Sequence, residues 1–176
     1  MISHKHQSIL FVHIHKTGVI SINYYLYGDI NISIILADYK RLYGLCLERN
    51  LFMQHAIAKQ ILEFGLVVDI QWDTYFKFTF IRNLCEKAVS VYFWLMNDQK
   101  IKDTFKNYLF KRGIFEKVLN NQYKSYYRGN HLGLKVEYFD YLGKYKFDYI
   151  GRFKTFNKEL NTVKSIFSVQ NKTLYI

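Results

Sequence analysis

The segment Phe11–Ser21, FVHIHKTGVIS, combines side chains that can bind an anion. Lys16 supplies a positive charge, and Thr17 and Ser21 supply hydroxyl donors. Gly18 adds a flexible backbone, and the segment contains no aspartate or glutamate that would repel an anion. A strand that ends in such a loop and passes into a helix directs backbone N–H groups and the positive end of the helix dipole at one point. The segment therefore predicts a site for phosphate or sulfate.

The order of residues in this loop excludes the phosphate loop of nucleotide triphosphatases. That loop requires G-x-x-x-x-G-K-[ST], whereas here Lys16 precedes Gly18. The tripeptide K-T-G also occurs in penicillin-binding enzymes, but this chain has no convincing S-D-N partner for it. Nucleoside triphosphates and β-lactam chemistry are therefore disfavoured.

A second segment, FTFIRNLCEKAVSVYF at residues 78–93, follows the same plan of strand, polar turn and helix. Arg82 stands at the end of the apolar run, and Ser90 falls about two turns into the following helix. A guanidinium and a hydroxyl so placed can hold a second phosphate through charge-assisted hydrogen bonds.

Three segments together resemble the carbohydrate-type sulfotransferases. FVHIHKTGVIS resembles that family's FVHIPKTGGTS loop, which binds the 5′-phosphosulfate, and FIRNLCEKAVSVY resembles its FVRNPYERLVSAY segment, which binds the 3′-phosphate. FDYIGRFKTFNKELNTV, residues 147–163, is similar to the family's DYIGRFENLEEDLNKV. The three segments occur in the family's order and span most of the chain.

The resemblance implies transfer of a sulfuryl group from 3′-phosphoadenosine-5′-phosphosulfate (PAPS) to a hydroxyl of a carbohydrate acceptor. It also implies the family's P-loop-like, three-layer α/β fold. Under this interpretation Lys16 stabilises the charge that builds up on the departing 5′-phosphate. The cofactor-binding residues would be Lys16, Thr17, Gly18 and Ser21 at the phosphosulfate and Arg82 and Ser90 at the 3′-phosphate.

The histidines are further candidates for chemistry. His55 in MQHAIAKQI matches the family's GHATAKEI segment and could accept the proton of the acceptor hydroxyl, or it could cap the helix that it begins. His13 and His15 share one face of a strand, but no acidic or cysteine partner follows at ligand spacing. No metal site is predicted.

Several residues depart from the family pattern. His15 replaces a proline, Val19 a second glycine and Ile20 a threonine or serine, while Lys154 reverses the charge of a glutamate. A valine resists positive φ, and an isoleucine removes a donor from the anion site. The alternative function is therefore a catalytically inactive, sulfotransferase-like protein that binds a nucleotide or a sulfated glycan.

The elements that must position these residues follow from the apolar pattern. SILFVHI and KFTFI, residues 8–14 and 77–81, are typical of buried parallel strands. Helices are predicted at SINYYLYG, with Ser21 as its cap and Gly28 at its end, at HAIAKQILEFG, residues 55–65, and at LCEKAVSVYFWLMN, residues 84–97. In the last helix Val89, Tyr92, Phe93 and Met96 recur at helical spacing. Alternating strands and helices predict an α/β fold with a central parallel sheet flanked by helices.

Composition limits what else the chain can be. Its 176 residues, 50% of them apolar, predict a single domain over residues 1–176, and a net charge of +11 favours an anionic partner. The charge is dispersed, which argues against nucleic acid, and two distant cysteines favour a reducing compartment. The sequence has no evident signal peptide or membrane span, so we expect a cytoplasmic location. The acceptor and the oligomeric state are not specified by the sequence.

Overall fold

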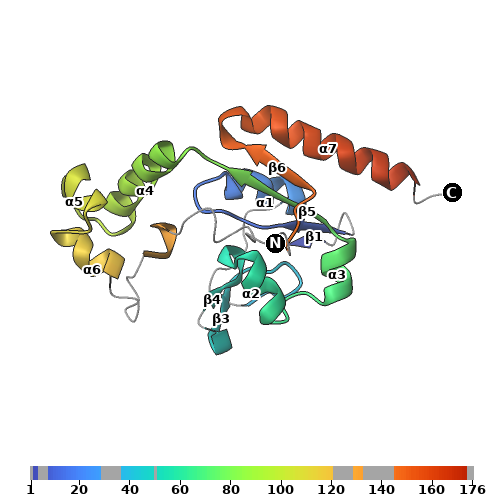
Figure 1. Cartoon of the computed structure of the whole chain (residues 1–176), viewed down its shortest axis with the longest axis horizontal. Helices are drawn as coiled ribbons and strands as arrows, with labels where there is room; N and C mark the ends of the chain where they lie inside the picture. The colour runs from blue at the N-terminus through green and yellow to red at the C-terminus, as the bar shows by residue number, and fades with distance from the viewer. Residues whose placement is uncertain are drawn as a thin grey trace. The chain divides into compact units, whose positions relative to one another are not determined.

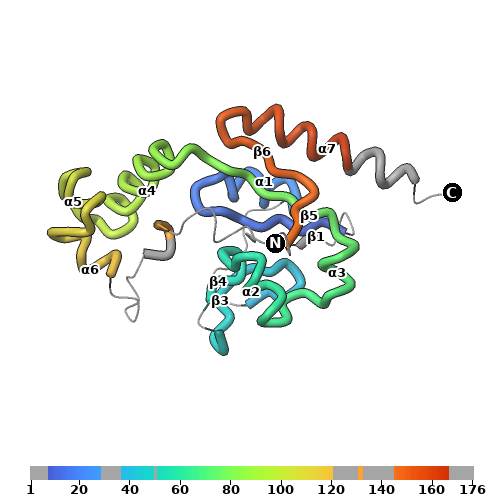
Figure 2. The backbone as a smooth tube through the Cα atoms, in the orientation of Figure 1, coloured from blue at the N-terminus to red at the C-terminus, as the bar shows by residue number. Residues whose placement is uncertain are grey.

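The computed structural model describes residues 2–3, 8–28, 37–49, 51–120, 129–132 and 145–173 (Figures 1 and 2). These residues belong to two compact units, the first drawn from residues 1–81 and 135–176 and the second from residues 82–134. Each hydrophobic cluster lies within one of the two units. The single domain over residues 1–176 stays a prediction.

The first unit is built on a four-stranded sheet in the order β1-β2-β5-β6. β2 pairs in parallel with β5, and β5 pairs in parallel with β6, whereas β1 runs antiparallel to β2. The predicted α/β fold with a central parallel sheet flanked by helices is thus confirmed, and its parallel part has three strands. The strands are β1 (Ile2–Ser3), β2 (Ile9–Phe11), β5 (Phe76–Ile81) and β6 (Tyr149–Arg152).

Alternate residues of β2 and its extension pack on opposite faces of this sheet. Ile9 and Phe11 join a cluster with side chains of α1 (Val19–Tyr27) and α7 (Phe156–Thr173). Leu10, Val12 and Ile14 join a second cluster with α2 (Ala58–Glu63) and α3 (Asp69–Thr74). Figure 1 shows α7 and α2 on opposite sides of the sheet. Because both faces are covered, the strand is apolar throughout, as a buried parallel strand should be.

Shorter elements complete the first unit, and four helices make up the described part of the second. The first unit also contains β3 (Leu45–Cys46), η1 (Leu47–Arg49), β4 (Leu51–Phe52), η2 (Met53–His55) and η5 (Phe153–Thr155). The second contains α4 (Leu84–Asp98), α5 (Phe105–Leu109), α6 (Ile114–Asn120) and η3 (Gly129–Leu132). Within the described residues, no helix has both the length and the apolar character needed to cross a bilayer.

Two predicted helices differ from the structure in detail. α2 begins at Ala58 because Ala56 and Ile57 are extended, and Gly65 follows its end with a φ of 62°. α4 has the predicted extent, but its buried side chains include Val91 and Leu95, whereas Val89 and Phe93 are exposed. The predicted apolar stripe on α4 is therefore wrong in part.

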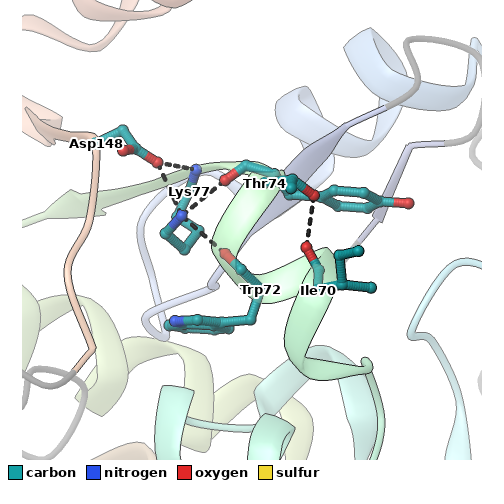
Figure 3. A network of polar contacts seen from close by, with 6 residues as sticks. Ile70, Trp72, Thr74, Lys77 and Asp148 are labelled. Carbon is teal, nitrogen blue, oxygen red and sulfur yellow. Dashed lines mark hydrogen bonds and ion pairs between the residues drawn. The ribbon is translucent and has the colours of Figure 1, made fainter.

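A buried lysine ties the edge strand β6 to the centre of the sheet (Figure 3). The Lys77 Nζ donates to the carbonyl oxygens of Trp72 at 2.9 Å and Tyr75 at 2.8 Å. The Asp148 Oδ2 lies 3.3 Å from the same Nζ and accepts the Lys77 backbone N–H at 2.7 Å. Each of the three ammonium N–H bonds thus has an acceptor, which makes burial of the charge tolerable.

Replacing this ammonium should destabilise the first unit. We expect Lys77→Met to keep the packing of the stem but to lower the free energy of unfolding by about 1–3 kcal/mol, because buried carbonyls lose a charged donor. Urea unfolding followed by circular dichroism measures the change. Lys59, which is exposed and pairs with Glu63 at 3.6 Å, is the matched control; Lys59→Met should change stability by less than about 0.5 kcal/mol. Equal effects of the two substitutions would contradict a role for the buried network.

Candidate functional site

The loop between β2 and α1 lies at the carboxyl end of a central strand, where ligands bind in open α/β sheets. Lys16 has a φ of 67° and Gly18 a φ of 84°, while Thr17 between them is not in the positive-φ region. When residues with positive φ alternate with residues without it, successive backbone N–H groups point to the same side and form a concave surface that can bind an anion. Figure 2 traces this path from β2 into α1. The predicted anion loop therefore has suitable backbone geometry.

Gly18 meets two requirements at once. Its positive φ favours glycine, and a Cβ at this position would lie 2.9 Å from the Phe156 Cε2 and 3.3 Å from the Phe153 Cε2. The Phe156 ring packs in turn on Phe80 with ring centroids 5.0 Å apart. The loop therefore packs closely against the start of α7, and a side chain at position 18 would have to displace aromatic rings.

Thr17 contributes to the shape of the loop. It is fully buried, and its hydroxyl donates to the Ile14 carbonyl oxygen at 2.5 Å. The hydroxyl therefore closes the loop on itself in this structure. Any contact between Thr17 and a ligand falls to its backbone N–H, and its predicted cofactor role stays a prediction.

The start of α1 differs from the prediction. Gly18 is the N-cap and Ser21 is an exposed residue of the first turn, so the prediction that Ser21 caps the helix is wrong. The left-handed conformation of Gly18 turns the chain directly into the helix, and no side chain of the described residues caps it. The first N–H groups of α1 then have no acceptor within the helix, which suits an anion at this end.

Val19 and Ile20 occupy ordinary helical positions. Val19 is the first residue of α1 and does not have a positive φ, so the expectation of backbone strain at this residue is wrong. The positive φ angles of this loop lie at Lys16 and Gly18 instead. Ile20 has 65% of its side chain exposed and offers no donor at the position where the resembled family has a hydroxyl.

Three histidines gather beside this loop in the first unit. His15 stacks on His55 with ring centroids 4.2 Å apart, and His13 lies 5.3 Å from His55. His13 and His15 are 3% and 2% exposed, and burial lowers the pKa of His55 to about 4. His55 is therefore neutral at pH 7 and a weaker base than an exposed histidine.

Helix capping and metal binding are two other roles to compare with the positions of the histidines. The N-cap of α2 is Ile57, whose N–H donates to the Gln60 Oε1 at 3.1 Å, so His55 does not cap this helix. Among the described residues no group of three or more histidine, cysteine, aspartate or glutamate side chains is arranged to hold a metal ion. The catalytic role of His55 stays a prediction.

Arg82 and Ser90 lie in the second unit. Arg82 directly follows the last residue of β5, and its Nε lies 3.9 Å from the Glu86 Oε2. Ser90 is a half-buried residue of α4. The described contacts bring Lys16 and Gly18 together in one loop, whereas they do not place Arg82 and Ser90 relative to that loop.

Asn83 is a positioning residue that the sequence analysis missed. Its Oδ1 accepts the backbone N–H of Cys85 at 2.9 Å and of Glu86 at 3.3 Å, which makes it the N-cap of α4. An asparagine just before an apolar helical pattern, with a glutamate three residues later, is the signal that could have identified it. Asn83 thereby fixes where α4 begins after Arg82.

Comparisons of the chain with protein-family models, curated proteins and solved structures find no significant match.

The contact at Gly18 predicts a difference between two glycines that share a left-handed backbone. Gly18→Ala should lower the free energy of unfolding by about 2–4 kcal/mol, since positive-φ strain adds to crowding against Phe156. Gly28 has a φ of 69°, and a Cβ there would meet nothing within 4 Å. Gly28→Ala should therefore cost only about 1 kcal/mol. Urea unfolding measures both; an equal loss would show that close packing at Gly18 is unimportant.

Burial of His55 predicts that stability falls as the medium becomes acidic. The pKa of His55 is about 4 in the folded protein against 6.5 for an exposed histidine, so the unfolded chain binds the proton first. This contribution is fully present above pH 6.5 and is lost as the pH falls toward 4. Between pH 7.5 and pH 5 the loss is about 2 kcal/mol.

Urea unfolding of the wild type and His55→Gln at these two pH values isolates the contribution from other titrating groups. The variant should lose about 2 kcal/mol less than the wild type on acidification, because glutamine does not titrate. The same pH dependence in both proteins would contradict the lowered pKa of His55.

Proposed function

We propose that the chain binds PAPS and transfers its sulfuryl group to a hydroxyl of a carbohydrate acceptor, on a P-loop-like sulfotransferase fold. The observation that carries the proposal is the backbone of the loop after β2. Lys16 and Gly18 have a positive φ, Thr17 between them does not, and α1 begins at the next residue. A lysine and uncapped helix N–H groups at the end of a buried parallel strand suit a phosphosulfate better than a neutral ligand.

The residues of this loop have distinct tasks in such a transfer. When bound, PAPS supplies an activated sulfuryl group, and its transfer to a sugar hydroxyl leaves adenosine 3′,5′-bisphosphate. Lys16 holds a positive charge where negative charge develops on the leaving phosphate oxygen. The backbone N–H groups from Gly18 onward hold the other oxygens without needing to reorganise, because α1 and the Phe156 contact fix them.

Arg82 and Ser90 are the proposed ligands of the 3′-phosphate, the group that distinguishes PAPS from other adenine nucleotides. Support comes from the position of Arg82 one residue beyond β5 and from the cap by Asn83, which together fix the start of α4. His55 is the proposed acceptor of the hydroxyl proton. Its lowered pKa makes this the weakest of the proposed roles, since a base is most effective with a pKa near the working pH.

A second candidate function is binding without transfer, with a nucleotide or a sulfated glycan as the ligand. Two observations favour it: the missing donor at Ile20 and the lowered pKa of His55. Neither removes the anion site at Lys16 and Gly18. The two functions differ in whether labelled sulfate moves from PAPS to an acceptor.

Nucleotide selectivity tests the assignment of Arg82. We expect adenosine 3′,5′-bisphosphate to bind much more tightly than adenosine monophosphate in a calorimetric titration. Arg82→Ala should weaken binding of the bisphosphate at least about tenfold, because a charge-assisted phosphate contact is lost. Arg112→Ala, which removes an exposed arginine of the same unit, is the control and should change the affinity less than about twofold. Equal affinity for the two nucleotides in the wild type would exclude the 3′-phosphate site.

Turnover tests the assignment of Lys16. Lys16→Ala should lower kcat roughly a hundredfold or more while changing cofactor affinity less, because the ammonium acts mainly on charge that develops during transfer. Lys16→Arg keeps the charge and the same backbone demand, so it should retain more activity than the alanine variant. The assay follows labelled sulfate from PAPS into a panel of polysaccharides. Normal turnover of Lys16→Ala would remove the catalytic role.

A further inference from the structure

A groove of about 570 Å³ runs between α1 and α7 in the first unit. This volume falls in the range of small-molecule sites, about 300–1,000 Å³. Pairs of residues four positions apart, which share one helix face, line the groove along both helices. The pairs are Ile20 with Tyr24 and Ser21 with Tyr25 on α1, and Leu160 with Lys164 on α7.

The lining places large apolar and aromatic surface next to solvent. Ile20 and Tyr24 are 65% and 61% exposed, whereas Leu160 is 8% exposed and Tyr25 is half-buried. Exposed apolar side chains that border a hollow mark a binding surface more often than isolated ones do. A tyrosine ring also carries a hydroxyl at its edge, so the groove suits a ligand with both apolar faces and polar groups.

Among the described side chains that line the groove, the charged one is a lysine. The Lys164 Nζ lies 5.0 Å from the centroid of the Tyr25 ring, and none of the described residues that line the groove is acidic. Glu159, the residue before Leu160 on α7, accepts hydrogen bonds from the hydroxyls of Tyr149 and Thr155. Burial raises the pKa of Tyr25, so its hydroxyl stays neutral. The lining therefore offers a cation and neutral hydroxyls to its ligand.

We propose that this groove binds the sugar rings of an acidic saccharide, with a ring face on Tyr24 and a carboxylate or sulfate at Lys164. The C–H groups of a sugar face carry slight positive charge and stack on the negative face of an aromatic ring. Ile20 and Ser21 are also the second and third residues of α1, directly after the anion loop. The groove thus presents the acceptor of the sulfuryl transfer, a role that rests on the function proposed above.

Calorimetric titration with tetragalacturonic acid and with neutral maltotetraose tests the site. The wild type should bind the acidic tetrasaccharide at least about tenfold more tightly, and added salt should reduce this preference. Tyr24→Ala should weaken binding about tenfold, and Lys164→Gln should weaken binding of the acidic tetrasaccharide about tenfold, with loss of the preference for the acidic ligand. Both variants should keep their affinity for adenosine 3′,5′-bisphosphate.

Two control variants separate the groove from general effects of charge and aromatic content. Lys158→Gln removes an exposed lysine of α7 that does not line the groove, and Tyr39→Ala removes an exposed tyrosine elsewhere in the same unit. Both should change saccharide affinity less than about twofold. Thermal unfolding of each variant confirms that it is folded.

Three results of the saccharide titrations would overturn the proposal. They are no measurable binding of the acidic tetrasaccharide by the wild type, an unchanged affinity in Tyr24→Ala, and equal losses in Lys158→Gln and Lys164→Gln. A loss of bisphosphate affinity in Tyr24→Ala would also overturn it, because the groove would then hold the nucleotide. Saccharide binding without any bisphosphate binding would support the groove while it excludes the sulfuryl transfer.

Discussion

The closeness of the Phe153 and Phe156 rings to Gly18, which leaves no room for a side chain there, is the constraint on which the site depends. It holds the loop after β2 against the start of α7, although the two segments lie far apart in the sequence. Because the same glycine is the left-handed N-cap of α1, one residue fixes the direction of α1 and its distance from α7. The conformation of Gly18 therefore shapes both the anion loop and the groove between these helices.

The sheet supplies the rigid base for this arrangement. β2 is fully buried and lies beside β5, and the buried Lys77 links β5 to the segment before β6 through Asp148. The parallel strands end on the same edge of the sheet, where the anion loop begins. A preorganised loop of backbone donors stabilises developing charge better than a flexible one, so rigidity here serves the proposed chemistry.

The sequence predicted the features that depend on local residue patterns, and it missed those that depend on contacts between segments far apart in the chain. β2 and β5 were predictable from their mostly apolar runs, whereas β6, the third parallel strand, was not predicted; Gly28 was predictable as the end of α1. The start of α1 was misplaced because a serine is a commoner cap than a left-handed glycine. The approach of Phe156 to Gly18 and the groove along Tyr24 both arise from the packing of α1 against α7, which no local pattern contains.

The most direct test of the central claim is a titration of ¹⁵N-labelled protein with adenosine 3′,5′-bisphosphate, followed by amide chemical shifts. If the loop after β2 is the phosphate site, the largest shifts will fall on the amides of Lys16–Ser21, because their N–H groups would contact the 5′-phosphate. Adenosine alone, which lacks both phosphates, should leave those amides unshifted. Binding of the bisphosphate that moves amides elsewhere and leaves Lys16–Ser21 unchanged would contradict the account.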